Sequence, residues 1–298
     1  MGKAPGRVLV IGDVMTDVIV RPEGPLVRGS DRRAAIASHP GGSGANQAMW
    51  LAAKQVPVGF VARVGAGDVT ALAAHFAARG VTPLFAGDRE AGSGVLVTIV
   101  DPDGERSFLT DRGANARLNA EDLPETLLDG TRVVVVSGYA LFEPGPRAAV
   151  QQLARAAMRR AIPVMVDAAS AGFLREVGPE RFLAWTDGFH TLFANVEEAE
   201  ALAGTDALSA QVVRLGASYK RVIIKRGAHG AALGGRDGVR CSLPAPLTAV
   251  VDTTGAGDAF AAGFLAAELG GMIEDVALGH AIAAGSAAIG FVGGQPRR

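Results

Sequence analysis

The chain has 298 residues, of which 49% are hydrophobic and 20% charged, and its formal net charge is -1. This length predicts one large α/β domain or two small ones, and the charge balance gives no reason to expect binding to nucleic acid or to an anionic membrane. With a single cysteine, Cys241, no disulfide can form within the chain, which is typical of a reducing cytoplasm. The first residues, "MGKAPGRVLVIGD", lack the long apolar stretch of a signal peptide, so a cytoplasmic location is expected.

Taken in chain order, continuous apolar runs predict buried parallel strands at 7–13, 131–138, 162–168, 191–195 and 221–227. Helical spacing of apolar residues predicts helices that separate or follow these strands at 45–55, 69–80, 145–161, 197–204 and 258–269. This alternation implies an α/β fold, with a mostly parallel sheet covered by helices on both faces. The segment "PLTAVVD" (246–252) predicts a strand or an extended segment, and the uncharged stretch 277–294 predicts a buried helix rather than a membrane span.

Two segments interrupt this alternation. The segment 17–40 has short extended runs divided by Pro and Gly, and 93–111 predicts a β-hairpin with "DPDG" as its turn. Because neither is followed by a crossover helix, together they predict a small sheet that projects from the main one. No repeat, low-complexity tract or linker divides the chain, so a single domain over 1–298 is expected.

A run of small residues precedes the predicted helix near the C-terminus. Gly255, Ala256 and Gly257 allow a tight backbone turn, and the first N–H groups of a helix favour an anion. Asp258 places a carboxylate directly behind this turn. That arrangement is explained if Asp258 takes a proton from a nucleophile that attacks a phosphoryl group. The alternative is that Asp258 is an ordinary acid in the first turn of a helix.

Two motifs carry a resemblance to a known family. "DTTGAGDAFAAGF" (252–264) resembles the C-terminal signature of the ribokinase-like (PfkB-type) carbohydrate kinases, and "PGGSGANQAMWLA" (40–52) is similar to their N-terminal Gly-Gly signature. Two motifs in the right order, about 200 residues apart, are more specific than either alone. The resemblance implies a ribokinase-like fold, in which segments 17–40 and 93–111 form a lid that can also pair two subunits, and an ATP-dependent kinase that uses Mg²⁺.

The acceptor side of the site is predicted from the first strand and the Gly-Gly signature. Ligands of open α/β sheets bind beyond the carboxyl ends of the strands, where Asp13 stands, and Asp13 and Asp17 can accept hydrogen bonds from hydroxyl groups. Gly41 and Gly42 allow close approach of the backbone. The resemblance implies that Asp13, Gly42 and Asn46 hold the phosphoryl acceptor. The alternative makes Asp13 a strand-end cap and Asn46 a helix-start residue.

Two further positions concern the identity of the acceptor. Glu143 also follows a predicted strand, and the resemblance implies a sugar-binding Glu near this place in some ribokinases, without deciding the role here. Ser43 stands where many ribokinases have Lys. This departure puts ribose in doubt as the acceptor but does not affect the phosphate chemistry.

The nucleotide side is predicted from two later strand ends. Asn195 and Glu198 are three residues apart and lie on one helix face. They resemble the family's Asn-x-x-Glu motif, which organises Mg²⁺ and phosphate largely through water, although the same pair can be a helix cap. The resemblance implies that Gly227 lies near the nucleotide phosphates. Lys225 or Arg226 could add positive charge there, or both could be solvated.

The resemblance also assigns the turn before Asp258. It implies that the amides of the Gly255–Gly257 turn form an anion hole for the transferred phosphate and that Asp258 is the catalytic base. Asp252 and Thr254, with carbonyl groups from "AAIGFVGGQP" (287–296), resemble the monovalent-cation loop of potassium-dependent members. The cofactors expected are therefore ATP and Mg²⁺, with K⁺ in the loop.

Other site types lack support in the sequence. No Gly-x-x-x-x-Gly-Lys-Ser/Thr run exists, and "VGAGDVTA" (64–71) lacks the third glycine of a dinucleotide fingerprint. The five His residues are scattered, and with one Cys they predict no zinc site.

The predicted function is transfer of the γ-phosphate of ATP to a hydroxyl group, expected to be a primary one, of a sugar or sugar-like acceptor. A nucleoside kinase of the adenosine or pseudouridine type is the alternative within the same chemistry. A catalytically silent sugar-binding regulator is the alternative of another class, and the intact Gly255–Asp258 run argues against it. The partners expected are small molecules, with no nucleic acid and no membrane, and a homodimer through the lid is the expectation for self-association.

Overall fold

The computed structural model describes residues 6–101, 103 and 105–297. Two residues of the predicted "DPDG" turn, Pro102 and Gly104, lie outside the described residues, as do the first five residues of the chain.

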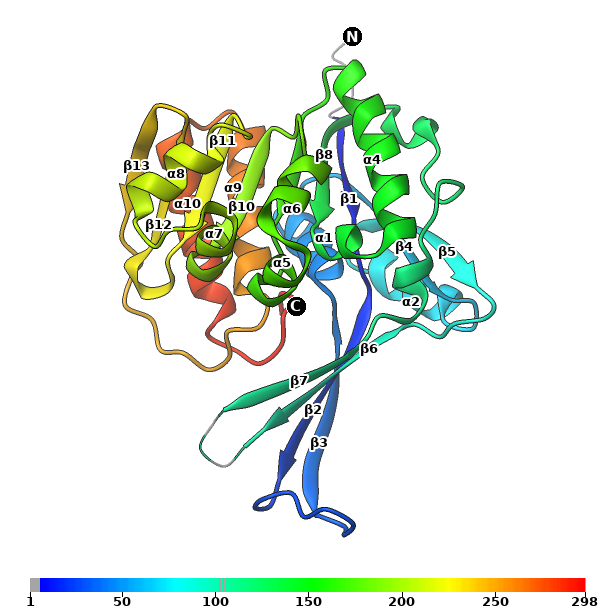
Figure 1. Cartoon of the computed structure of the whole chain (residues 1–298). Helices are drawn as coiled ribbons and strands as arrows, with labels where there is room; N and C mark the ends of the chain where they lie inside the picture. Colours follow the sequence, from blue (N-terminus) through cyan, green and yellow to red (C-terminus); the bar gives the residue numbers. More distant parts are fainter. Residues whose placement is uncertain (1–5, 102, 104, 298) are drawn as a thin grey trace.

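The main sheet has nine strands in the order β13-β12-β11-β10-β9-β8-β1-β4-β5 (Figure 1). These strands are β1 (Arg7–Ile11), β4 (Val58–Gly65), β5 (Val81–Asp88), β8 (Thr131–Ser137), β9 (Val164–Asp167), β10 (Thr191–Asn195), β11 (Arg221–Lys225), β12 (Ala231–Gly235) and β13 (Gly238–Leu243). All neighbouring pairs from β5 to β11 are parallel, and β12 and β13 pair antiparallel at one edge. The predicted mostly parallel central sheet is confirmed.

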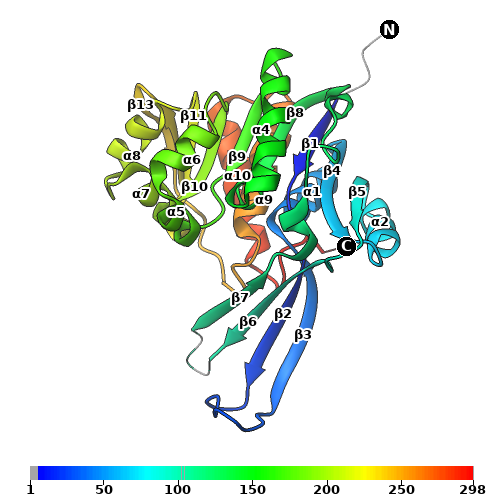
Figure 2. The same ribbon diagram turned by 45° about the vertical axis from the view of Figure 1, so that its right-hand side comes forward.

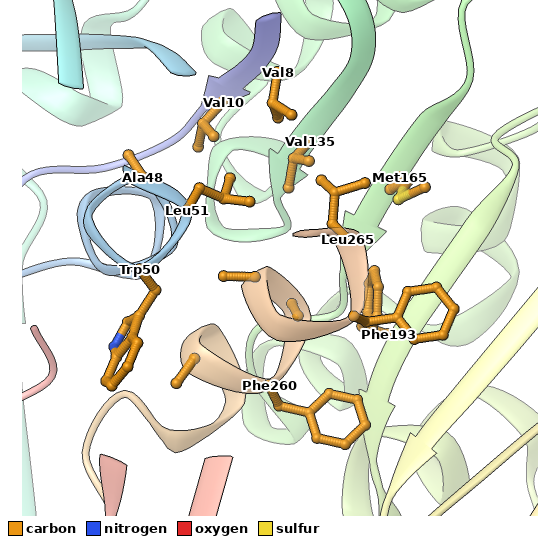
Figure 3. Packing of buried hydrophobic residues seen from close by; sticks show 14 of the residues in the cluster. Val8, Val10, Ala48, Trp50, Leu51, Val135, Met165, Phe193, Phe260 and Leu265 are labelled. Atoms are coloured by element: carbon orange, nitrogen blue, oxygen red, sulfur yellow. The ribbon is translucent and has the colours of Figure 1, made fainter. Parts of the chain in front are cut away.

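Helices cover both faces of this sheet, because successive side chains of a strand point to opposite faces. Val8 and Val10 of β1 belong to one hydrophobic core, which also contains residues of α1, α9 and α10 (Figure 3). Leu9 and Ile11 belong to a second core, on the opposite face, with residues of α4 and α7. The helices are α1 (Ser43–Ala53), α2 (Val69–Ala77), α3 (Tyr139–Phe142), α4 (Pro144–Arg159), α5 (Ala171–Val177), α6 (Pro179–Trp185), α7 (Val196–Ala203), α8 (Leu208–Leu215), α9 (Ala256–Leu269) and α10 (Glu274–Ala288). Short 3₁₀ turns occur as η1 (Gly113–Arg117), η2 (Glu125–Leu128) and η3 (Gly227–His229).

A separate four-stranded sheet, called the small sheet below, consists of β2 (Met15–Pro22), β3 (Ala34–Gly41), β6 (Gly94–Val100) and β7 (Arg106–Asp111). Its order is β3-β2-β6-β7, and it projects from the main body (Figures 1 and 2). β6 and β7 pair antiparallel as the predicted hairpin, and β2 and β6 pair in parallel to join the two segments. The predicted small sheet is confirmed.

One predicted element is wrong in part. A strand is one of the two interpretations of 246–252, but residues 244–250 form no regular secondary structure. The antiparallel edge strand β13 ends at Leu243. The segment that follows it leads to α9 along the carboxyl ends of the central strands, where it forms part of the wall of a large cavity, and the Leu247 side chain is fully exposed. The stretch 277–294 is helical as far as Ala288, and within the described residues no helix has both the length and the hydropathy needed to cross a bilayer.

Candidate active site

A cavity of about 880 Å³ opens at the carboxyl ends of the central strands. Asp167, Asn195 and Lys225, the last residues of β9, β10 and β11, lie in its wall. Other parts of the wall come from the segment 245–250, the first turn of α9 and the face of α10. This location agrees with the rule that open α/β sheets bind ligands beyond the carboxyl ends of their strands.

Asp258 lies in the first turn of α9, behind the left-handed Gly255, whose φ is 73°. Its carboxylate accepts three hydrogen bonds, all from side chains of α1. Ser43 Oγ donates to Oδ1 over 2.7 Å, Asn46 Nδ2 donates to Oδ2 over 3.0 Å, and Gln47 Nε2 lies 3.3 Å from Oδ1. The two signature motifs, far apart in the sequence, therefore meet at one carboxylate.

The surroundings of Asp258 bring its pKa close to neutrality. Burial is the largest cause and the charge of Asp167 adds to it, so that the pKa rises from the usual 3.8 to about 7. The hydrogen bonds from Ser43 and Asn46 and the charge of Lys225 act in the opposite direction. A carboxylate with such a pKa can accept a proton and release it near neutral pH.

The turn before Asp258 presents backbone N–H groups to the cavity, since Gly255, Ala256 and Gly257 all belong to its wall. Ala256 N–H donates to the carbonyl of Thr253 over 3.3 Å, which leaves the other amides of the turn as the open donors. Because Gly257 has no side chain, the ammonium group of Lys225 can lie close to the turn: a β-carbon at position 257 would be 3.0 Å from Lys225 Nζ. The helix terminus and the ammonium group thus attract an anion to the same place.

Lys225 is held by Asp167, a residue that the sequence analysis missed. Lys225 Nζ lies 2.7 Å from Asp167 Oδ2, and both side chains are largely buried. Burial by itself would lower the pKa of Lys225, but the charges of Asp167 and Glu198 outweigh it, so the pKa is raised and the side chain stays protonated. The strand-end position of Asp167 in "VMVDA", which parallels that of Asp13, is the signal that could have identified it.

Asn195 and Glu198 form a capping box at the start of α7. Asn195 Oδ1 accepts from the Glu198 N–H over 2.8 Å, and Glu198 Oε2 accepts from the Asn195 N–H over 2.7 Å. The capping interpretation of this motif is confirmed, and the two residues also belong to the cavity wall, where their role toward Mg²⁺ and phosphate stays a prediction. Burial raises the pKa of Glu198 to about 7, and the charge of Lys225 opposes this. Gly227 and Arg226 lie in the same wall, and Gly227 has a φ of 53°.

Asp13 lies at the carboxyl end of β1 and is buried. Its Oδ1 accepts from Gly44 N–H and from Ser137 Oγ, each over 3.2 Å, and its Oδ2 accepts from an Arg112 NH group over 3.2 Å. Arg112 also lies over the ring of Tyr139, 5.0 Å from its centre. No motif in the sequence pointed to Arg112, which directly follows β7 of the small sheet and reaches Asp13 through the tertiary fold.

Asp17 projects from β2 and packs against Gly41 at the end of β3, where a β-carbon would overlap its carboxyl group. Only 8% of Asp17 is exposed, and within the described part of the chain its Oδ1 has no hydrogen-bond partner. Burial, followed by the charges of Asp13 and Asp252, raises its pKa to about 6. Gly42 is the N-cap of α1, with a φ of 98°, and a β-carbon there would lie 2.5 Å from the carbonyl oxygen of Asp13.

Glu143 differs from Asp13, Asp17 and Asn46 in its exposure, since those three side chains are buried, although none of the four lines the cavity. It is the exposed N-cap of α4 and is not among the residues that line the cavity. Its contact with a sugar stays a prediction that the geometry does not support.

The two halves of the predicted cation loop lie together. Asp252 Oδ1 accepts from Thr254 N–H over 3.0 Å and from Thr254 Oγ1 over 2.8 Å, and Asp252 Oδ2 accepts from Gly293 N–H over 3.0 Å. The segment 287–296 therefore runs beside the turn that precedes α9.

Comparison with known proteins identifies similar chains. A sequence model described as "pfkB family carbohydrate kinase" matches residues 6–296. The "Bifunctional protein HldE" of Pseudomonas savastanoi pv. phaseolicola is 32% identical over 306 residues, which cover 97% of this chain but 60% of that protein, so the chain spans about three-fifths of its length. The "Uncharacterized sugar kinase YegV" of Escherichia coli is 29% identical over 97% of this chain and 90% of its own length.

Solved structures show the same fold. An adenosine kinase from Sinorhizobium meliloti superimposes with a TM-score of 0.84 at 25% identity, covering 98% of this chain and 96% of that one. A probable sugar kinase protein from Rhizobium etli superimposes with a TM-score of 0.87 at 24% identity, covering 99% and 96% of the two chains.

Proposed function

Since the chain belongs to the pfkB family of carbohydrate kinases, we propose that it is an ATP-dependent kinase that transfers the γ-phosphate of ATP to a primary hydroxyl group of a neutral sugar or sugar-like acceptor. The observation that carries this proposal is the position of Asp258. Its carboxylate borders the large cavity on one side and is hydrogen-bonded to the Gly-Gly signature helix α1 on the other.

In the proposed reaction, the acceptor hydroxyl replaces part of the hydrogen-bonding around Asp258 and gives its proton to that carboxylate. The acceptor oxygen forms a bond to the γ-phosphorus, and the bond from that phosphorus to the β–γ bridging oxygen breaks, so that ADP leaves with the electron pair. The open amides of the Gly255–Gly257 turn and the ammonium group of Lys225 stabilise the charge on the transferred phosphoryl group. Asp167 keeps Lys225 beside the turn.

The described residues fit an Mg²⁺ ion bound with the nucleotide. Glu198 lies in the cavity wall, and its Oε2 is used by the capping box, so Oε1 is the oxygen that can face the ion, directly or through water. When bound, Mg²⁺ would neutralise part of the charge of the phosphate groups. The family relative solved with ATP and Mg²⁺, a putative ribokinase II from Escherichia coli, shares the fold, with a TM-score of 0.85 at 20% identity.

The charges around Asp13 favour a neutral acceptor. Asp13 and Asp17 are both buried carboxylic acids, and the neighbouring guanidinium of Arg112 is already paired with Asp13. Hydroxyl groups can donate to the open Oδ1 of Asp17, whereas a carboxylate or phosphate on the acceptor would lie among like charges. Asp17, Asn46 and Asp258 are the residues that we assign to the acceptor directly.

A nucleoside acceptor is the second candidate. Ser43 and Tyr139 line the cavity next to Asp258, and the small Ser43 side chain leaves space that a lysine would fill. The similarity to an adenosine kinase is consistent with this candidate. The catalytically silent regulator is disfavoured, because Asp258 and the open turn before it are intact.

The test is ATP consumption with a mixed panel of acceptors: D-ribose, D-fructose, adenosine, pseudouridine, a 2-keto sugar acid and a sugar phosphate. We expect ADP and phosphorylated acceptor in equal amounts for a neutral member of the panel, with ³¹P NMR showing a primary phosphate ester. Preference for an acidic or phosphorylated acceptor would contradict the neutral class. Saturable sugar binding without any ADP formation would support the regulator instead.

A further inference from the structure

The C-terminal segment 289–295 follows α10 and returns to the candidate active site. It is hydrogen-bonded to Val251 and Asp252, which precede α9. Val251 N–H donates to the carbonyl of Ile289 over 2.8 Å, and Gly293 N–H donates to Asp252 Oδ2 over 3.0 Å. The segment is therefore fixed on one side by the residues that lead into the turn before Asp258. Neither signature motif contains it.

Gly294 in this segment touches two parts of the reaction centre with its bare backbone. A β-carbon at position 294 would lie 2.5 Å from Asn46 Nδ2, 2.9 Å from its Cγ and 3.0 Å from its Oδ1. A β-carbon at Gly255 would lie 2.5 Å from the Cα of Gly294. Gly294 is buried, so no solvent separates it from either neighbour. Its backbone thus packs between the Asn46 amide and the N-cap of α9.

Only one end of the Asn46 amide has a hydrogen-bond partner among the described residues. Its Nδ2 donates to Asp258 Oδ2 over 3.0 Å, while its Oδ1 is buried and has no hydrogen-bond partner in the parts of the chain that the structure describes. A buried carbonyl oxygen without a partner beside the proposed base gains a hydrogen bond if the acceptor, on binding, brings a hydroxyl group to it. This works only if the amide keeps its present orientation.

Trp50 fixes Gly294 from the same helix that carries Asn46. The indole Nε1 donates to the carbonyl of Gly294 over 2.9 Å, and the ring stacks with Phe291 at a centre-to-centre distance of 6.4 Å. Trp50 follows Asn46 by one helical turn on α1, so the two side chains lie on one face. Figure 3 shows Trp50 projecting from α1 on the side away from Val8 and Val10 of β1.

From these contacts we infer that Gly294 is a positioning residue for phosphoryl transfer: its bare backbone holds the Asn46 amide in the orientation that donates to Asp258. Trp50 maintains the position of Gly294. The inference rests on the proposed function, in which Asn46 binds the acceptor and Asp258 is the base. It adds a contribution from the C-terminal segment that neither motif predicts.

The first test is Gly294→Ala, measured with the acceptor from the panel above that gives the highest rate. A methyl group at this position pushes the Asn46 amide away from Asp258, so acceptor kcat/KM should fall by about 10- to 100-fold while the Kd for ATP stays within about twofold. Gly279→Ala in α10 is the matched control, since its β-carbon would meet nothing closer than 3.9 Å, and it should retain wild-type kinetics. Trp50→Phe keeps the ring but loses the donor and should lower kcat/KM by roughly 2- to 10-fold.

A double-substitution cycle separates positioning from a merely structural role. If Gly294 acts through Asn46, Gly294→Ala should cause no further loss in an Asn46→Ala background, because the amide that it displaces is gone. Equal losses in both backgrounds would overturn the inference. Wild-type acceptor kinetics for Gly294→Ala, or a loss that appears only in ATP binding, would overturn it as well.

A crystal structure of Gly294→Ala provides a readout that does not depend on the acceptor. We expect the Asn46 Nδ2 to Asp258 Oδ2 hydrogen bond to be broken, and an unchanged bond would contradict the inference. If the panel yields no phosphorylated product from the wild-type protein, the proposed function fails, and this structure still decides whether Gly294 positions Asn46. If Gly294→Ala does not fold, Trp50→Phe in the presence and absence of Asn46→Ala supplies the same cycle.

Discussion

Asp258 shows how a single carboxylate acquires its chemistry from residues distant in the sequence. Burial and the charge of Asp167 favour its protonated form, and the donors Ser43 and Asn46 favour its charged form. These opposing effects leave its pKa at about 7. An Asp with the usual pKa would be a much weaker proton acceptor at neutral pH.

Replacing Asp258 with Asn should separate catalysis from binding and folding. Asn keeps the shape but cannot take a proton, so kcat should fall by about 10²–10⁴-fold, while the affinity for ATP stays similar or improves. The raised folded-state pKa means that the free energy of unfolding contributed by Asp258 decreases as pH rises from 3.8 to about 7. Asp258→Asn should therefore melt at or above the wild-type temperature at pH 8. A folded variant with near wild-type turnover would remove Asp258 from the role of base.

Replacing Ser43 with Ala should move the pH profile in a defined direction. The Ser43 hydroxyl stabilises charged Asp258, so its loss should raise the pKa of Asp258 above about 7. Since the base must be ionised, the acidic limb of kcat/KM should shift to higher pH, with most of the lost activity regained at pH 9. Profiles of both proteins from pH 5.5 to 9.5 check this. A shift to lower pH would show that the hydrogen bond does not favour the carboxylate.

The element that decides the geometry of the turn before α9 is the loop formed by Asp252, Thr254 and the segment 287–296. Asp252 bridges its two halves, since its two oxygens accept from Thr254 and from Gly293. A monovalent cation bound by carbonyl groups of this loop would polarise the amides of the same turn.

We therefore expect K⁺ to raise activity over Na⁺ and over a large organic cation such as tetramethylammonium. Initial rates at constant ionic strength measure this, and Asp252→Asn should reduce the K⁺ response. Identical rates in the three salts would show that the loop is a structural connection only.

The small sheet is the element expected to respond to the acceptor. Asp17 in β2 is buried and is one of the residues that we assign to the acceptor, so acceptor binding should draw the sheet toward the main body. The tip of the sheet exposes Arg28, Arg32 and Arg33, which are trypsin sites. Acceptor should slow tryptic cleavage at these residues, and ATP alone should not. Cleavage that is indifferent to the acceptor would contradict closure.

At the scale of the whole molecule, the small sheet leaves apolar side chains in solvent. Ile36, Phe108 and Leu109 are between 59% and 65% exposed on its outer strands. Exposed edges and apolar residues of this kind are usually covered in a stable assembly. We expect a homodimer through this sheet, with a light-scattering mass of twice the 30.4 kDa of the chain. Phe108→Asp should give the mass of one chain, and a strict wild-type monomer at about 50 μM would exclude the dimer.

Much of the architecture is encoded locally. The apolar runs that end at Ile11, Ser137 and Lys225 identify buried strands because both faces of a central strand must be covered. The predicted ends of four of the five strands differ by one to two residues from the structure, since hydrophobicity does not show where pairing stops. The segment 246–252 was harder, because its β-branched residues favour a strand, yet residues 244–250 form no regular secondary structure.

The candidate site was predictable to the extent that its residues lie in motifs. Asp13, Asn46, Asn195 and Asp258 stand at strand ends or helix starts, where the sequence itself shows both the turn and the polar group. Glu143 also follows a strand, yet α3 and the start of α4 place it on the exposed surface, whereas Asp13 and Asn46 are buried. A position after a strand therefore does not fix the direction of a side chain.

The sequence by itself determined five strands of the main sheet, the small sheet and the two motifs that define the kinase family, because these depend on periodicity and on short runs of residues. It did not identify the main-sheet strands β4, β5, β12 and β13. Only the tertiary structure decided that Lys225 pairs with Asp167, that Arg112 reaches Asp13, and that Gly294 packs against Asn46. Each of these contacts joins two segments that are far apart in the chain, and neither segment contains a motif that indicates the other as its partner. They exist because parallel strands bring their carboxyl ends to one edge, where packing distances and buried charges, rather than local propensity, select the partners.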